Sequence, residues 1–340
     1  MSFCFNFDLS ATTNTDDVQG KTSSTDKIDI VAKPVNESGC PAEAVKEAKE
    51  HFPPSDSLHL LDDAIYETLT IGTLPPLHFL NETVFEKTVY EREDTENILC
   101  RTAEQRSDLI SGVYEGGLKV WECTYDLLEV IEREGETFGG KAVLDLGCGT
   151  GLLGILSLKR KAREVHFQDY NSTVLEQLTV SNVILNCQDD DCDNDDDDDD
   201  SKGKNKGTTD KEEECKIKLK HDTRDLFLQR CRFFSGDWRT FLILASSQDP
   251  SLKYDIILTS ETIYNTAYYP ALHDTFHKLL APRGHVYVAT KSHYFGVGGG
   301  LHLFETFVQE RGVFSLNHLW ASEDGLQRHV VVLRFKKESH

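Results

Sequence analysis

The sequence contains no run of about 18 apolar residues, and it therefore predicts no membrane-spanning helix. Its N-terminus lacks the basic region and apolar stretch of a signal peptide. The nine cysteines are irregularly spaced and include no Cys-x-x-Cys pair, which argues against a zinc ribbon and against a disulfide framework. These absences favour a protein with reduced thiols in the cytosol or nucleus. With 39% hydrophobic residues, the 340-residue chain can still bury a sizeable core.

Positive charge is also scarce: the chain has 36 Lys and Arg but 58 Asp and Glu, which gives a net charge of −22. Ten of the aspartates lie within residues 189–200. We interpret residues 187–222 as an acidic disordered insertion, since self-repelling charge and glycine disfavour a packed structure. The block lacks the spacing of an EF-hand, so no metal is expected. An acidic surface repels phosphate, which predicts a basic protein partner and no direct nucleic-acid binding.

The rest of the chain divides by composition. Residues 1–55 are rich in Ser, Thr, Asp, Lys and Pro and predict a mostly disordered tail. The alternating phenylalanines from Phe3 to Phe7 predict either a short docked strand or a partner-binding motif. Apolar content rises over residues 56–110, which we interpret as an extension packed on the core. Residues 111–340 are predicted to form the main domain.

Within that domain, apolar strands alternate with amphipathic helices. Strands are predicted at residues 143–146, 164–168, 231–235, 254–259 and 284–290, with two late strands at 314–319 and 329–335. Helices are predicted at residues 118–131, 152–161, 174–185, 268–280 and 301–311. The alternation predicts a doubly wound α/β fold, and the two late strands predict an antiparallel hairpin. We therefore expect a mostly parallel, seven-stranded, Rossmann-like sheet of the class I methyltransferase type.

A glycine-rich turn follows the first of these strands. The spacing of Gly147, Gly149 and Gly151 allows the backbone to approach a ligand closely. Residues 149–154 also match the Gly-x-Gly-x-x-Gly pattern of nicotinamide enzymes. Two features favour S-adenosylmethionine (SAM) instead: the first glycine after the strand is Gly147, and the strand ends near Asp145, whose carboxylate suits the ammonium group of a methionine moiety.

Polar and aromatic residues follow the next strands. Asp169 ends the second strand, where a carboxylate accepts hydrogen bonds from ribose hydroxyls, although a helix cap is an alternative. Gly236 and Asp237 follow the third strand, where Asp237 is a candidate acceptor for the adenine amino group. Trp238 is a candidate cover for the ring, with a capped turn and a core tryptophan as the alternative. Trp121 is either a core residue or a second cover for the cofactor.

The end of the fourth strand is expected to face the transferred methyl group. Glu261 and Tyr264 are three residues apart there, and a carboxylate and a phenol at this spacing can orient an incoming nucleophile. Residues 293–300 follow the fifth strand and contain four glycines. They predict either a flexible spacer or a mobile rim of a substrate cleft.

Several of these segments together resemble the eukaryotic protein-histidine methyltransferase family, the methyltransferase-like eighteen group. The matching segments are residues 107–124, 143–149, 166–171, 233–238, 258–265 and 293–300. The resemblance covers about residues 100–340, and the opening Phe-rich segment is similar too. It implies that one histidine of a large-subunit ribosomal protein, the universal L-three protein, is methylated at the tele nitrogen. It also implies a monomer in the cytosol and in the nucleus, including the nucleolus.

The resemblance, taken with the motifs, implies a cofactor site for SAM, with S-adenosylhomocysteine as the product. The candidate cofactor-binding residues are Val120, Trp121, Glu122, Cys123, Thr124, Asp145, Gly147, Gly149, Gln168, Asp169, Tyr170, Gly236, Asp237, Trp238 and Ser260. The candidate catalytic residues are Glu261, Tyr264 and Asn265. Our hypothesis is that Glu261 or Asn265 holds the non-reacting nitrogen of the acceptor imidazole and that Tyr264 forms a wall of its channel.

Two other functions fit the same residues. A protein-lysine methyltransferase could use Glu261 and Tyr264 to help remove the proton that a lysine amine carries at neutral pH. A ribosome-assembly factor that binds SAM without catalysis is the alternative from another class. The retained Asp145, glycines and Asp169 argue against the second reading.

Overall fold

A computed structural model gives the fold of residues 45–53, 61, 65–81, 96–105, 108–187, 226–323 and 325–337. The phenylalanine-rich start, most of the predicted tail and residues 188–222 of the predicted insertion lie outside these described residues.

One eight-stranded sheet organises the described chain, with the strand order β1-β6-β5-β4-β7-β8-β10-β9. Its strands are β1 (Lys49–His51), β4 (Ala142–Leu146), β5 (Glu164–Asp169), β6 (Cys231–Ser235), β7 (Tyr254–Ser260), β8 (Leu280–Lys291), β9 (Phe314–Ala321) and β10 (Arg328–Phe335). The five strands from β6 to β8 are parallel, and β10 runs antiparallel to both β8 and β9. The predicted, mostly parallel sheet with a closing antiparallel hairpin is confirmed, and β1 adds an eighth strand.

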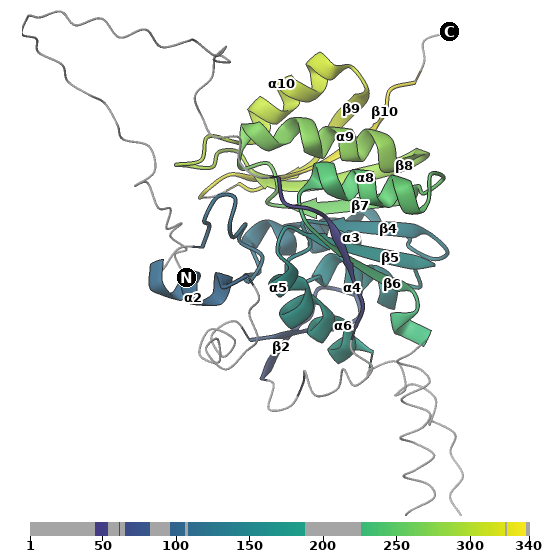
Figure 1. The fold of residues 1–340 in the computed structure, drawn as a ribbon. Helices are drawn as coiled ribbons and strands as arrows, with labels where there is room; N and C mark the ends of the chain where they lie inside the picture. Colours follow the sequence, from purple (N-terminus) through teal and green to yellow (C-terminus); the bar gives the residue numbers. More distant parts are fainter. Residues whose placement is uncertain are drawn as a thin grey trace, which may run out of the picture.

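Helices cover both faces of the sheet (Figure 1). One face carries α3 (Glu122–Glu134), α4 (Leu152–Lys159) and α6 (Val180–Asn186); the other carries α8 (Trp238–Gln248), α9 (Tyr269–Leu279) and α10 (Leu301–Arg311). Strand alternation produces the two cores, since Val143 packs with α3 and α4 while Leu144 and Leu146 pack with α8 and α9. No helix in the described part of the chain is long and apolar enough to cross a membrane.

Most helix predictions hold, with three differences. Helix α3 begins at Glu122, four residues later than predicted, so Trp121 becomes its N-cap. Helix α8 was not predicted. The predicted helix at 174–185 is divided into α5 (Ser172–Val174), a π-helical turn η3 (Leu175–Thr179) and α6. Single π turns inside α-helices often occur at functional sites.

Strand β1 holds part of the predicted tail against the sheet edge. It pairs antiparallel with β6, and Glu50 accepts two hydrogen bonds from Arg232, at 2.8 and 2.9 Å. The buried His51 contacts Ser235 Oγ through Nε2 at 2.7 Å. A planar guanidinium and a carboxylate paired in this way fix orientation as well as proximity. Residues 45–48 consequently lie beside the end of β6.

Three further elements come from the predicted extension: β2 (Tyr66–Leu69), β3 (Leu77–Leu80) and α2 (Ile98–Gln105). The β2–β3 hairpin packs on α6. The Asn182 amide oxygen accepts from Leu80 N at 2.8 Å, and the Asn186 amide oxygen accepts from His78 N at 2.9 Å. Asn182 also donates to Thr150 O at 2.9 Å, which ties the hairpin to the glycine turn.

Candidate active site

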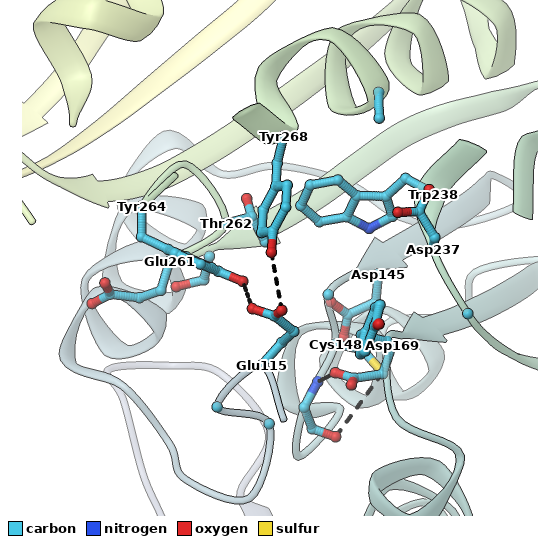
Figure 2. A pocket seen from close by; sticks show the side chains of 18 of the residues that line it. Glu115, Asp145, Cys148, Asp169, Asp237, Trp238, Glu261, Thr262, Tyr264 and Tyr268 are labelled. Carbon is cyan, nitrogen blue, oxygen red and sulfur yellow. Dashed lines mark hydrogen bonds between the residues drawn. The ribbon is translucent and has the colours of Figure 1, made fainter. Parts of the chain in front are cut away.

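A cavity of about 540 Å³ lies at the carboxyl ends of the parallel strands, the usual ligand position in such sheets. Figure 2 shows Glu261 and Tyr264 on one side of it and Trp238 on the other. Most of the sequence-predicted residues line it: Trp121, Thr124, Asp145, Gly147, Gly149, Asp169, Tyr170, Gly236, Asp237, Trp238, Ser260, Glu261 and Tyr264. The residues that do not are Val120, Glu122, Cys123, Gln168 and Asn265.

The glycine turn after β4 forms the floor of the cavity. Gly147 and Gly149 have positive φ angles of 67° and 50°, which glycine adopts without steric cost. A Cβ on Gly147 would lie 2.7 Å from Thr262 Cγ2, so a side chain there would press into the end of β7. Thr179 in the π turn donates to Gly149 O at 2.6 Å. The turn is therefore held open toward the cavity by its neighbours.

Asp145 is a buried carboxylate with an incomplete set of hydrogen bonds. Its side chain lies at the end of β4 and the residue is only 1% exposed. Oδ2 accepts from Gly154 N at 2.8 Å, while Oδ1 has no hydrogen-bond partner among the described residues. Burial, with a smaller effect from the Asp169 charge, raises the pKa of Asp145 to about 8. Such a group gains most from a cationic ligand.

Asp169 lies on the neighbouring strand end. Its Oδ2 accepts from Gly149 N at 2.9 Å and its Oδ1 from Asn171 N at 3.0 Å, which fixes the carboxylate and leaves each oxygen a further lone pair. Burial raises the pKa of Asp169 to about 6, and these two backbone hydrogen bonds oppose that rise. At neutral pH the group is therefore mostly ionised and able to accept from hydroxyl groups.

These features fit SAM. The cavity volume is within the usual range for cofactor pockets. The three basic residues that line it are each paired with an acid: Lys46 with Glu96, Lys119 with Asp108 and Arg239 with Asp237. Asp145 is left with a buried, unpartnered oxygen, which suits the ammonium group of a methionine moiety.

The far end of the cavity lies between β6 and the segment before β1. Trp238 donates from Nε1 to Gln168 Oε1 at 2.9 Å, and this hydrogen bond fixes the orientation of the indole ring. The Asp237 carboxylate caps α8 and pairs with Arg239 at 2.9 Å. Lys46 O accepts from Asp237 N at 3.1 Å, which brings the N-terminal segment over this end. The predicted adenine contacts of Asp237 and Trp238 remain predictions.

Glu115 joins two tyrosines at the other end (Figure 2). It accepts from the hydroxyl of Tyr264 and, at 3.1 Å, from that of Tyr268; Gly112 N donates to it at 2.7 Å. Burial and the Glu115 charge hold the pKa of Tyr264 well above its usual range. Tyr264 therefore remains a neutral donor, which suits it to shape a channel and not to act as a base.

Glu261 has an unusual backbone and an unusual environment. It is a non-glycine residue with a φ of 59°, a conformation that persists only where surrounding contacts impose it. The residue is 8% exposed; its Oε1 lies 3.4 Å from the Lys291 ammonium, and the Cys123 and Tyr294 side chains lie against the carboxylate. It lines the main cavity and also an adjoining cavity of about 30 Å³, shared with Glu115, Trp121, Tyr264 and Tyr294.

Backbone hydrogen bonds tie the glycine-rich segment after β8 to this site, and its Tyr294 lines the adjoining small cavity. Gly299 N donates to Tyr264 O at 2.7 Å, and Tyr294 N donates to Gly299 O at 3.0 Å. Gly300 N donates to the Tyr269 hydroxyl at 3.0 Å. These bonds place the buried Tyr294 side chain behind Glu261 and Tyr264.

The residues that miss the cavity have other roles. Val120 packs against the core and Cys123 is fully buried, so burial and the Glu261 charge raise the pKa of its thiol. Glu122 pairs with Lys291 at 2.9 Å. The Asn265 side chain caps the 3-10 helix η4 (Thr266–Tyr268) by accepting from Ala267 N at 3.0 Å. Asn265 lines neither cavity, whereas Glu261 lines both, so the structure favours Glu261 of the two candidates for holding an acceptor.

Sequence reasoning missed three residues of the site: Glu115, Tyr268 and Lys291. Glu115 lies inside the matching segment 107–124 and directly before two glycines, which was the available signal. Lys291 follows the apolar run of β8, where a lysine suggests the point at which a strand reaches solvent. The structure shows the opposite, because Lys291 is 0% exposed.

Comparisons with known proteins identify the same chemistry. A family model described as a methyltransferase domain matches residues 122–330. The histidine protein methyltransferase 1 homolog of Bos taurus is 45% identical over 294 residues, covering 86% of this chain and 74% of that protein. The homolog of Rattus norvegicus is 41% identical over 324 residues, covering 93% and 84%. Histidine protein methyltransferase 1 of Saccharomyces cerevisiae is 27% identical over 255 residues, covering 68% and 67%.

SAM binding near pH 7 should release protons. The Asp145 carboxyl, with a pKa of about 8, is mostly protonated in the free protein and must ionise to pair with an ammonium group. The release should shrink as the pH approaches 8, and affinity should rise up to about that pH, above which the ammonium group of the ligand, with an α-amino pKa of about 7.7–8.0, loses its proton. Calorimetry in buffers of different ionisation enthalpy measures it. Asp145→Asn should remove most of the release and weaken binding by roughly tenfold or more, as expected for a charge-assisted hydrogen bond. Equal release by both proteins would contradict this role.

Gly299→Ala should disturb the acceptor side of the site. The added Cβ would lie 2.2 Å from Tyr264 C and 2.4 Å from Ile263 O, both backbone atoms that cannot move independently. We expect turnover to fall about tenfold or more, since small displacements of positioning groups are costly, with a smaller change in SAM affinity. Gly139→Ala is the control, because its Cβ meets nothing within 4 Å. Indistinguishable kinetics of the two variants would show that the loop does not position Tyr264.

Proposed function

Because the chain belongs to the histidine protein methyltransferase 1 family and is a SAM-dependent protein-histidine methyltransferase, we propose that it modifies one histidine of a large-subunit ribosomal protein. The resemblance described above names the universal L-three protein and the tele nitrogen. The net charge of −22 supports a basic protein substrate. A ribosomal substrate in turn suggests a monomeric enzyme present in the cytosol and nucleus, including the nucleolus, with an influence on ribosome assembly or translation elongation.

The observation that carries the proposed mechanism is the Glu261 carboxylate, buried at the end of β7, with the Lys291 ammonium 3.4 Å from Oε1 and the Cys123 and Tyr294 side chains beside it. Oε1 is paired with the ammonium, and Oε2 has lone pairs that can accept an N–H from a ligand. An imidazole with a pKa of about 6.5 is mostly neutral at cellular pH and carries one N–H and one lone pair. Glu261 accepting from the N–H would leave the other ring nitrogen as the nucleophile.

The chain's contribution is positioning and proton handling. SAM supplies a methyl group on a cationic sulfur, and its transfer to nitrogen leaves a thioether and a positive charge on the ring. The Glu261 carboxylate stabilises that charge and accepts the proton from the second nitrogen. Tyr264, held by Glu115, and the Gly299 segment restrict the path of the ring. Asp145 would hold the ammonium group of the methyl donor and Asp169 its ribose hydroxyls. A lysine acceptor, with a pKa of about 10.4, would first need a base.

Glu261→Ala should lower turnover by roughly 10²-fold, the lower end of the usual contribution of a positioned proton acceptor, with little change in SAM affinity. The assay is transfer of labelled methyl groups to large-subunit proteins from cells that lack the enzyme. The labelled protein is then identified and its methylated amino acid analysed. Glu136→Ala is a matched control, because this half-buried carboxylate pairs with Lys141 and lines neither cavity.

The outcomes separate the alternatives. Labelled tele-methylhistidine in a single basic ribosomal protein supports the proposal. Methyllysine would favour the lysine reading, and SAM binding without transfer to any ribosomal protein would favour a non-catalytic assembly factor. Unchanged turnover in Glu261→Ala would remove Glu261 from the mechanism while leaving the substrate proposal intact.

A further inference from the structure

A buried cluster of three charged residues lies behind the acceptor side of the cavity. Lys291, the last residue of β8, is 0% exposed. Its Nζ lies 2.9 Å from Glu122 Oε2 and 3.4 Å from Glu261 Oε1. It also lies 5.4 Å from the centroid of the Trp121 ring. The ammonium group therefore links the start of α3 to the end of β7.

Burying an ammonium group completely is costly, and an apolar side chain of similar volume would often stabilise a protein more. This charge is therefore better explained by specificity than by stability. The position of Lys291 in the sheet supports this view. Lys291 lies opposite Arg328 in the register of β8 and β10, and the Arg328 guanidinium binds Asp126 at 2.6 Å. Two neighbouring cations thus pair with acids of α3, but only Lys291 also reaches a residue that lines the cavity.

We propose that Lys291 is a positioning residue that determines which imidazole nitrogen is methylated. The inference rests on the proposed role of Glu261. Through its ion pair with Oε1 at 3.4 Å, the ammonium limits rotation of the Glu261 carboxylate and so restricts the direction from which Oε2 accepts the ring N–H. Because the nitrogen that donates to Glu261 is not the one that attacks, a fixed carboxylate selects one ring nitrogen. A carboxylate free to rotate would accept either tautomer.

Glu122 has a supporting part in this arrangement. It is the first residue of α3, where a negative charge also interacts favourably with the helix dipole. Its contact with Lys291 is the shorter of the two, so Glu122 anchors the ammonium and Glu261 is oriented by it. Two carboxylates sharing one ammonium leave negative charge near the acceptor, which suits a ring that becomes cationic during transfer.

The test compares Lys291→Met with the wild type on the protein substrate that the wild type labels. The product is hydrolysed, and tele- and pros-methylhistidine are separated and quantified. We expect Lys291→Met to lower turnover at least tenfold, to change S-adenosylhomocysteine affinity less than about threefold, and to produce a substantial fraction of the pros isomer. A variant that only loosened the fold would make less product of the same isomer.

Two further variants sharpen the result. Arg328→Met is the matched control: it removes an ion pair to the same helix from the adjacent strand position, so it should lower the melting temperature and still give only the wild-type isomer. In the Glu261→Ala background, Lys291→Met should cause no further loss of turnover, because residues that act through one another are not additive.

Either of two results overturns the inference: Lys291→Met makes only the wild-type isomer, or its loss of turnover multiplies with that of Glu261→Ala. If Lys291→Met does not fold, Lys291→Gln, which keeps a polar group at the position, is judged by the same two results. Wild-type activity in Glu261→Ala alone would instead show that the proposed role of Glu261 is wrong.

Discussion

The Asp145 carboxylate at the end of β4 is nearly fully buried, and one of its oxygens has no hydrogen bond from the described residues. Asp169 and Glu261 lie at the ends of the two strands beside β4, and both residues are also buried. Parallel strands force this arrangement, because their carboxyl ends meet at one edge of the sheet. Burial makes each carboxylate costly without a cation or an N–H donor. Asp169 already has two backbone N–H donors and Glu261 has the Lys291 ammonium, so the unmet need is greatest at Asp145 Oδ1, which suits the ammonium group of SAM.

The surrounding structure keeps these carboxylates in place. The glycine turn lies against Thr262, the π turn holds Gly149, and the segment before β1 covers the end of β6. On the acceptor side, Glu115 binds two tyrosines and Lys291 binds Glu261. In the proposed mechanism the second group orients the acceptor. A neutral imidazole needs orientation more than it needs a strong base, and a carboxylate with a fixed direction supplies orientation.

The sequence was sufficient for features that are local. Alternating apolar runs predicted the central strands, and the glycine spacing with Asp145 predicted a SAM site. Features that depend on contacts between residues far apart in the sequence could not be predicted from it. Strand β1 consists of Lys-Glu-His and exists because Glu50 meets Arg232, 182 positions away. Lys291 was not singled out, because nothing in its own segment shows that Glu122 and Glu261 surround it. The capping of η4 by the Asn265 side chain was not predicted, and its catalytic role stays a prediction.

In the proposed mechanism the Glu261 carboxylate holds one nitrogen of the acceptor ring. The most direct measurement is a crystal structure of the protein with S-adenosylhomocysteine and a substrate peptide in which the target histidine is not yet methylated. We expect a hydrogen bond from the ring Nδ1 to Glu261, with Nε2 directed at the sulfur of S-adenosylhomocysteine. A ring whose Nδ1 binds another residue, or whose nitrogens lie outside hydrogen-bond distance of Glu261, would contradict it.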